Sequence, residues 1–197
     1  MKKNKHFFIF RHGQTTYNLN GYIQGQTNDS LLTDKGKEQA FQIGEKLKHF
    51  PLDILLCSPL TRAKQTAQEV LKFFPGLKVR TEPACTEVNI GKIEGMHFEE
   101  VLNLYGKQYQ KWRDINDTDL DFCFPNGESK GAVRKRAFSL IEHYLNNTDY
   151  QHIAISTHGI FLSQICLELN YPVTEIKNGQ ILHLHYNENS IKIEFIN

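Results

Sequence analysis

Long hydrophobic runs are missing from this sequence. The apolar run that follows the basic N-terminus covers only Phe7 to Phe10. It is too short for the core of a signal peptide and far below the roughly 18 residues that span a bilayer. No other segment approaches that length. We therefore expect no membrane partner and a cytoplasmic location.

Cysteine is also scarce, and the four cysteines form no C-x-x-C pair. They are scattered along the chain as Cys57, Cys85, Cys123 and Cys166. In the absence of an export signal, this spacing predicts reduced thiols rather than a disulfide framework or a zinc site. We expect them to be buried like other small apolar side chains.

An excess of charge of either sign is absent as well. Lys and Arg total 23 and Asp and Glu total 22, which leaves a formal net charge of +1. This balance gives no reason to expect nucleic acid or an anionic membrane as a partner. Any strong positive field must be local, from a few arginines placed together.

Apolar runs and apolar periodicity alternate along the chain in the manner of an α/β protein. They predict strands at residues 6–10, 53–57, 78–81, 152–156, 181–186 and 191–196. They predict helices at residues 33–50, 60–74, 98–115, 128–147 and 160–169. The expected fold is a three-layer sandwich: an open, mostly parallel sheet with helices on both faces and a C-terminal hairpin. We expect a single domain over residues 1–197.

Four local features support these assignments. Thr33 is a good N-cap for the first long helix. The apolar face of that helix is expected to comprise Ala40, Phe41, Ile43, Gly44 and Leu47. Residues 116–127 form a polar, Asp-rich loop, and residues 187–190 form the turn of the hairpin.

Basic side chains directly follow the three clearest strands. Arg11 and His12 follow the first, Ser58-Pro59 with Arg62 follows the second, and His158 follows the strand at 152–156. In open α/β sheets, ligands bind at the carboxyl ends of the strands. Two histidines and two arginines should therefore converge on one edge of the sheet.

This set of residue types suits a phosphate monoester, which is a dianion. The planar fork of an arginine binds two phosphate oxygens at once and keeps its charge. Helix starts near Leu60 and Gly159 add backbone N–H donors. Glycines at positions 13 and 159 would let the backbone approach a ligand closely.

Two histidines at strand ends further suggest covalent chemistry, because a neutral imidazole is a competent nucleophile. The sequence has no Walker-type glycine loop with lysine, no Cys-x5-Arg loop and no Asp-rich metal motif. This elimination favours histidine chemistry that needs no metal and no cofactor.

Five motif blocks, in order, make the sequence similar to the histidine phosphatase superfamily, in its phosphoglycerate-mutase-like branch. The blocks are Arg11-His12-Gly13-Gln14-Thr15 with Asn18, residues 32–40, residues 58–67, Glu87-x-x-x-Gly91-x-x-Glu94-Gly95, and Gly127-Glu128-Ser129 with residues 156–159. One R-H-G triplet would be weak support, whereas ordered blocks from residue 11 to residue 159 are strong.

The resemblance implies a role for each matching residue. It implies His12 as the nucleophile, with Arg11, Arg62 and His158 forming the phosphate pocket. It implies Glu87 as the acid that protonates the leaving oxygen and then activates water. The remaining positions are implied to bind phosphate or substrate: Asn18, Gln24, Gly25 and Gly159.

Some positions depart from the family or have ordinary explanations. Thr86 stands where many relatives have arginine, which leaves the substrate open. The spacing of His183 and His185 puts both rings on one face of a strand, as a metal site would, but no third ligand is evident. The aromatic residues Tyr109 and Trp112 fit core packing better than substrate stacking.

Three functions remain open at this stage. The short stretch from residue 88 to residue 126 resembles phosphatases of small phosphorylated molecules, since mutases carry a long insertion there. A cofactor-dependent phosphoglycerate mutase is the first alternative. A non-catalytic phosphoryl-binding module is the second, although such a module could lose His12 or Glu87. The sequence leaves the oligomeric state undecided, with a homodimer among the alternatives.

Overall fold

The computed structural model describes residues 4–27, 30–115, 119–188 and 190–196. The strands are β1 (Lys5–Arg11), β2 (Ile54–Cys57), β3 (Lys78–Thr81), β4 (His152–Thr157), β5 (Ile181–Tyr186) and β6 (Ile191–Ile196). The α-helices are α1 (Thr16–Asn20), α2 (Asp34–Leu47), α3 (Thr61–Leu71), α4 (Phe98–Arg113), α5 (Lys130–Asn147) and α6 (Gly159–Glu168). Two 3-10 turns lie between β3 and α4, η1 (Pro83–Cys85) and η2 (Gly91–Ile93).

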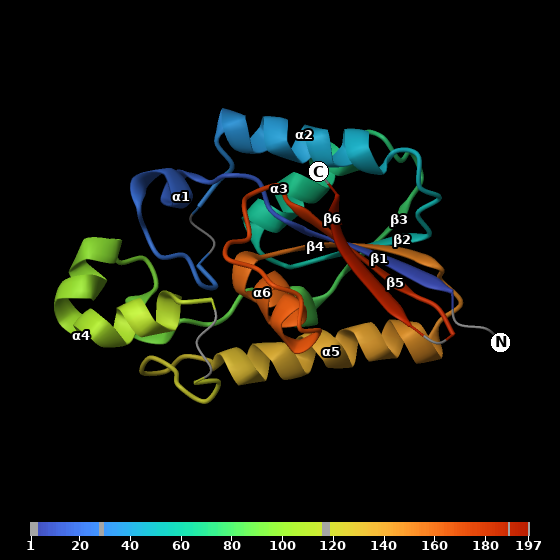
Figure 1. Cartoon of the computed structure of the whole chain (residues 1–197). Helices are drawn as coiled ribbons and strands as arrows, with labels where there is room; N and C mark the ends of the chain where they lie inside the picture. Colours follow the sequence, from blue (N-terminus) through green and yellow to red (C-terminus); the bar gives the residue numbers. More distant parts are fainter. Residues whose placement is uncertain (1–3, 28–29, 116–118, 189, 197) are drawn as a thin grey trace.

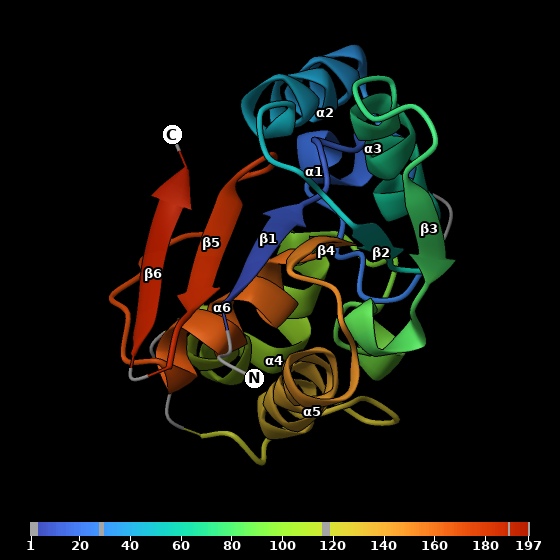
Figure 2. The same ribbon diagram turned by 90° about the vertical axis from the view of Figure 1, so that its right-hand side faces the viewer.

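The strands form one six-stranded sheet in the order β3-β2-β4-β1-β5-β6. The first four strands of this order are parallel, and β5 and β6 run antiparallel as a hairpin at one edge. Helices cover both faces of the sheet, with α2 and α3 on one side and α5 and α6 on the other (Figures 1 and 2). The predicted α/β sandwich with its C-terminal hairpin is confirmed.

The central strand β1 shows why the sheet needs two helical layers. Its side chains alternate between the two faces, as the pleat requires. Phe7 and Ile9 belong to the core shared with α5 and α6, whereas Phe8 and Phe10 pack with α2 and α3. All four are completely buried. A strand that is apolar on both faces is stable only when both faces are covered.

Two sequence-based expectations about single residues are wrong. Phe41 is 40% exposed, although it was assigned to the apolar face of α2. Its ring instead packs edge-on against that of Phe73, which lies just after α3, with centroids 4.8 Å apart. Cys123 is exposed in the segment before α5, whereas the other three cysteines are buried.

The ends of the predicted helices and strands differ from the observed ends by a few residues. Thr33 caps α2 as expected, because its side chain accepts a hydrogen bond from the backbone N–H of Gly36. The loop predicted at 116–127 and the turn predicted at 187–190 each include positions outside the described residues (116–118 and 189). Within the described part of the chain, none of the helices is long and apolar enough to cross a membrane.

Four histidine rings stack side by side across the sheet, remote from the ends of the strands that carry the basic cluster. His6 of β1 lies between His152 of β4 and His185 of β5, with centroid distances of 4.8 and 4.1 Å. Its Nδ1 is 2.9 Å from Nε2 of His183, whose other nitrogen faces Glu194. The rings lie parallel, and among the described residues no group has the arrangement of a metal site.

The histidine stack predicts that acid destabilises the protein. Burial and the three neighbouring rings lower the pKa of His6 to about 4. The unfolded chain takes up this proton near its ordinary pKa of 6.5, so stability is full above that pH and falls as the pH decreases toward 4. We expect His6→Phe, which keeps the stacking, to remove about 1 kcal/mol of this loss, or about 2–4 °C in Tm.

The measurement is the melting temperature at about pH 7.5 and about pH 5. His143→Phe, at an exposed position of α5, is the matched control. If His6→Phe and wild type lose the same number of degrees between the two pH values, the stack is not a source of acid sensitivity.

Candidate active site

Four basic side chains lie together at one edge of the sheet. Arg11 and His12 come from the end of β1, His158 follows β4, and Arg62 lies in the first turn of α3, directly after β2. These three strands are neighbours in the order β2-β4-β1. The rings of His12 and His158 have centroids 5.3 Å apart. The topology therefore brings together residues that lie up to 147 positions apart in sequence (158 − 11).

The hydrogen bonds of His12 define its tautomer. Nε of Arg62 lies 3.2 Å from Nε2 of His12 and can only donate, so Nε2 must carry a lone pair. The proton is therefore on Nδ1, which lies 2.8 Å from the carbonyl oxygen of Gly13 and donates to it. Burial, together with Arg62 and Arg11, lowers the pKa of His12 well below its ordinary value. The result is a neutral imidazole with an oriented lone pair, which is the form that a nucleophile needs.

Arg62 is fixed by carbonyl groups of the loop that follows α1. Its two terminal nitrogens donate to the carbonyl oxygens of Gly25 and Thr27, at 2.6 and 2.9 Å. Burial lowers the pKa of Arg62 to about 10, although the charge of Glu87 partly offsets this effect. The guanidinium therefore keeps its charge at neutral pH. The contribution of Gly25 in this structure is thus a backbone contact to the arginine.

Arg11 and His158 each have a buried nitrogen without a hydrogen-bond partner among the described residues. Nη1 of Arg11 donates to the carbonyl oxygen of Ile176 at 2.5 Å, but its Nε has no partner. Nε2 of His158 lies 2.8 Å from Oγ of Ser58, but its Nδ1 has none. A buried polar atom left in this state costs about 1–3 kcal/mol. Each of these nitrogens could bond a polar ligand that reaches it.

The carboxylate of Glu87 lies at the start of α6. It accepts hydrogen bonds from the backbone N–H groups of Ile160 and Phe161, at 3.1 and 3.3 Å, and from that of Val88 at 3.0 Å. The residue is 9% exposed. Its charge opposes the effect of burial on the pKa of Arg11. Glu87 is therefore held next to the basic cluster by the N-terminus of the helix that follows His158.

The side-chain amides of Asn18 and Gln24 both turn their oxygens toward Thr15. Oδ1 of Asn18 accepts from the backbone N–H of Thr15 at 3.2 Å, and Oε1 of Gln24 accepts from the Thr15 hydroxyl at 3.0 Å. The NH2 end of each amide is the part that a phosphate oxygen could contact. Gly159 lies against Arg11, since a Cβ there would be 3.4 Å from Nε of the guanidinium.

Gly13, which is expected to let the backbone approach a ligand, also makes a close contact within the chain. A Cβ at Gly13 would lie 2.1 Å from the carbonyl oxygen of Gly36, and one at Gly36 would lie 2.0 Å from that of Gln14. Two segments of backbone therefore touch where the first motif block meets the second. The glycines allow packing of the chain on itself.

Asn178 is a residue of the site that sequence reasoning missed. Its Nδ2 donates to the carbonyl oxygen of His12 at 3.0 Å and to Oδ1 of Asn18 at 3.2 Å. It thereby joins the nucleophile's backbone to the amide of Asn18. The antiparallel direction of β5 could have signalled it, because the start of that strand lies at the edge of the sheet where β1 ends.

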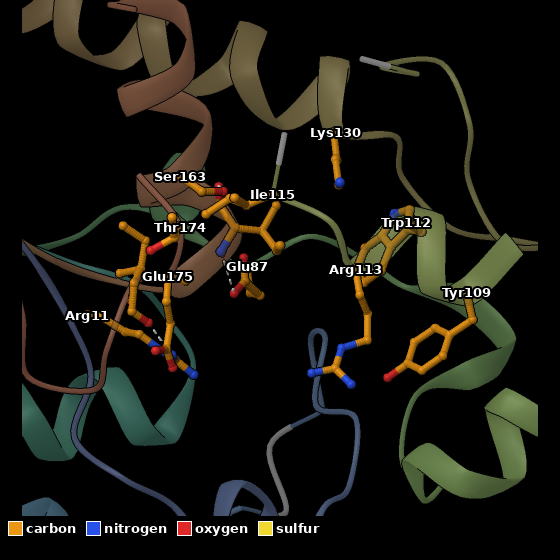
Figure 3. Close-up of a pocket in the computed structure, with 13 residues that line it drawn as sticks. Arg11, Glu87, Tyr109, Trp112, Arg113, Ile115, Lys130, Ser163, Thr174 and Glu175 are labelled. Atoms are coloured by element: carbon orange, nitrogen blue, oxygen red, sulfur yellow. Dashed lines mark hydrogen bonds between the residues drawn. The ribbon is translucent and has the colours of Figure 1, made fainter. Parts of the chain in front are cut away.

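A cavity of about 530 Å³ opens from Arg11 and Glu87 toward the N-terminal ends of α5 and α6 (Figure 3). One side carries the polar side chains Thr174 and Glu175 (Figure 3). The opposite side combines aromatic and cationic groups: Tyr109, Trp112, Arg113 and Lys130. Tyr109 and Trp112 are nearly buried and at the same time line this cavity, so they belong to both the core and the site.

Known proteins are similar to this chain in sequence and in fold. The family model described as histidine phosphatase superfamily (branch 1) matches residues 7–197. The 2,3-bisphosphoglycerate-dependent phosphoglycerate mutase of Bartonella henselae is 33% identical over 168 residues, which is 82% of this chain and 79% of the relative.

Two solved structures align over nearly the whole chain. The α-ribazole phosphatase of Shigella flexneri has a TM-score of 0.81 and 27% identity, and the match covers 98% of this chain and 96% of that one. A mycobacterial glucosyl-3-phosphoglycerate phosphatase has a TM-score of 0.81, 23% identity and coverage of 98% and 97%, and this likeness concerns the fold alone.

Proposed function

The chain belongs to the histidine phosphatase superfamily, branch 1, and from this membership and its site we propose that it hydrolyses small phosphomonoesters through a phosphohistidine on His12. The observation that carries the proposal is the tautomer of His12. Its Nε2 lone pair is held toward a charged arginine in a buried pocket, where a phosphoryl group would be bound. No step of this reaction uses a metal or a cofactor.

In the first step, the phosphoryl oxygens contact Arg11, Arg62 and His158, with Asn18 adding its amide N–H. Nε2 of His12 gives up its hydrogen bond from Nε of Arg62 and attacks phosphorus, so that a P–N bond forms and the P–O bond to the alcohol breaks. Glu87 transfers its proton to the departing oxygen, so the alcohol leaves neutral. The two arginines stabilise the charge on the phosphoryl group.

In the second step, the carboxylate of Glu87 takes a proton from water, and the resulting hydroxide attacks phosphorus. The P–N bond breaks, inorganic phosphate leaves, and the lone pair returns to Nε2 of His12. Glu87 is again protonated and ready for the next substrate. One residue thus acts as acid and then as base, which splits a difficult hydrolysis into two easier transfers.

The cavity beyond the phosphate pocket supports a polar alcohol as the leaving group. Thr174, Glu175 and Ser163 offer hydrogen-bonding groups, whereas Arg113 on the opposite side offers positive charge. A volume of about 530 Å³ is within the range of pockets for small molecules. A panel of sugar phosphates, phosphoglycerates, nucleotides and α-ribazole phosphate would identify the substrate.

A phosphoglycerate mutase is the second candidate, and the Bartonella relative at 33% identity is the observation in its favour. The two activities diverge after the phosphoenzyme forms, since a mutase must keep water away from it. The short segment between Glu87 and Gly127 leaves less chain to enclose the intermediate. We therefore favour hydrolysis.

With 3-phosphoglycerate and a bisphosphoglycerate primer, the protein is expected to release inorganic phosphate faster than it forms 2-phosphoglycerate. Both products are measured in the same reaction, in excess EDTA, with an authentic mutase as the control for isomer formation. Isomer formation that outruns phosphate release would assign the protein to the mutase class. If the protein forms no 2-phosphoglycerate and releases inorganic phosphate from no member of the panel, the result would favour a non-catalytic phosphoryl-binding module.

A further inference from the structure

Arg136 of α5 contacts the backbone of the loop that carries Glu87. Its Nη1 donates to the carbonyl oxygens of Ala84 and Thr86, at 2.8 and 2.6 Å. Its Nη2 donates to the carbonyl oxygen of Glu87 itself, at 3.1 Å. Three carbonyl dipoles that converge on one point repel each other, and a guanidinium with several donors is the side chain that can hold them together.

Glu128 holds the guanidinium from the other side. Its carboxylate receives two parallel hydrogen bonds from Nε and Nη2 of Arg136, at 2.8 and 3.0 Å. Both side chains are about one-fifth exposed, so the pair is shielded from solvent more than a surface ion pair is. The backbone N–H of Glu128 donates to the carbonyl oxygen of Asn89 at 2.7 Å, and the Glu128 carboxylate accepts from the backbone N–H of Asn89 at 3.3 Å. The pair therefore fixes the loop on both sides of Glu87.

The same arginine also touches the helix to which the Glu87 carboxylate is bonded. Its guanidinium carbon lies 5.8 Å from the ring centroid of Phe161, within cation–π distance. The backbone N–H of Phe161 donates to Oε1 of Glu87. Arg136 thus bonds the backbone of Glu87, Phe161 bonds its carboxylate, and the side chains of Arg136 and Phe161 contact each other.

We propose that Arg136, held by Glu128, is a positioning residue that fixes the Glu87 carboxylate for its two proton transfers. This proposal rests on the proposed function, in which Glu87 is the acid and base. The nucleophile and the phosphate-binding arginines come from the end of β1 and from α3. None of the hydrogen bonds of Arg136 described above reaches these two elements. Loss of the contact should therefore impair proton transfer and leave the hydrogen bonds of Arg11 and Arg62 intact.

The test compares Arg136→Met with Arg134→Met. Arg134 lies on the same helix and forms an ion pair of similar length with Glu168, but its partners are on α6 and not on the loop. Arg136→Met is expected to lower kcat on an alkyl phosphate by about 10–100-fold, the cost of misplacing a catalytic group by a fraction of an ångström to an ångström. The pre-steady-state burst of p-nitrophenol should change by less than about threefold, because that leaving group needs no proton.

Two further variants keep the result interpretable. Glu128→Gln weakens the hold on the guanidinium without removing it and should give a smaller loss of the same kind, even if Arg136→Met folds poorly. In the background of Glu87→Gln, the Arg136 substitution should cost little more on the alkyl phosphate, since the group that it positions no longer transfers a proton.

The outcomes separate this proposal from the proposed function. Equal losses on both substrate types for the Arg136 and Glu128 variants, with Glu87→Gln selective for alkyl phosphates, would make the pair merely structural and overturn the proposal. If Glu87→Gln is itself not selective, the assignment of the acid fails first, and the positioning role fails with it. Full activity in Arg136→Met on both substrates would also refute the role.

Discussion

Replacement of His12 by alanine is expected to lower kcat by about 10⁴-fold or more on every substrate. The imidazole Nε2 is the only atom that forms the covalent bond in the proposed reaction, so its loss removes the route rather than weakening it. Binding of inorganic phosphate should survive. The substitution releases Nε of Arg62 from its bond to His12, which adds a donor for the anion.

Turnover is measured with the substrate identified from the panel, and phosphate binding by isothermal titration calorimetry. His49→Ala, at an exposed histidine just after α2, controls for the effect of deleting an imidazole elsewhere. Residual activity within about tenfold of wild type would rule out covalent catalysis by His12.

Replacement of Glu87 by glutamine is expected to lower the rate on alkyl phosphates by about 10²–10⁴-fold, the usual contribution of general acid catalysis. An alkoxide is a poor leaving group without a proton, whereas the p-nitrophenolate anion is stable near neutral pH. The burst of p-nitrophenol should therefore change much less. The glutamine oxygen can still accept a bond from the start of α6, where the native carboxylate accepts from Ile160 and Phe161.

The burst phase must be measured for this variant, because the same substitution also slows the attack of water in the second step. Steady-state rates with p-nitrophenyl phosphate would mix the two effects. Burst rates that fall equally for both substrate types would exclude Glu87 as the acid. Glu82 and Glu94 would then be the next carboxylates to examine.

The parts of the fold that could be predicted are those with a local sequence signal. Strands β1, β2 and β4 are short apolar runs that end at polar or basic residues, and each precedes an apolar periodicity of helical spacing. The rule for parallel sheets then places their carboxyl ends at one edge. Arg11, Arg62 and His158 could be grouped on this basis without knowledge of any contact.

Contacts between distant segments could not be predicted in the same way. The bond from Asn178 to the His12 carbonyl and the bonds from Arg136 to the Glu87 loop join segments that have no shared pattern. Gly13 shows the limit most clearly. The sequence predicted a close approach of its backbone to a ligand, but gave no sign of its contact with the backbone of Gly36. Phe41 was misassigned because helical spacing alone does not reveal where the covered face ends.

The central claim is a covalent phosphoryl group on Nε2 of His12, and rapid trapping tests it most directly. Wild type is mixed with substrate and quenched in alkali within the burst phase, since phosphohistidine survives alkali and is lost in acid. Peptide mass spectrometry then locates the phosphoryl group, and ³¹P NMR distinguishes the two ring nitrogens. Because Nδ1 of His12 donates to Gly13, we expect the label on Nε2 of His12. A label on another residue or on Nδ1, or no label during turnover, would contradict the mechanism.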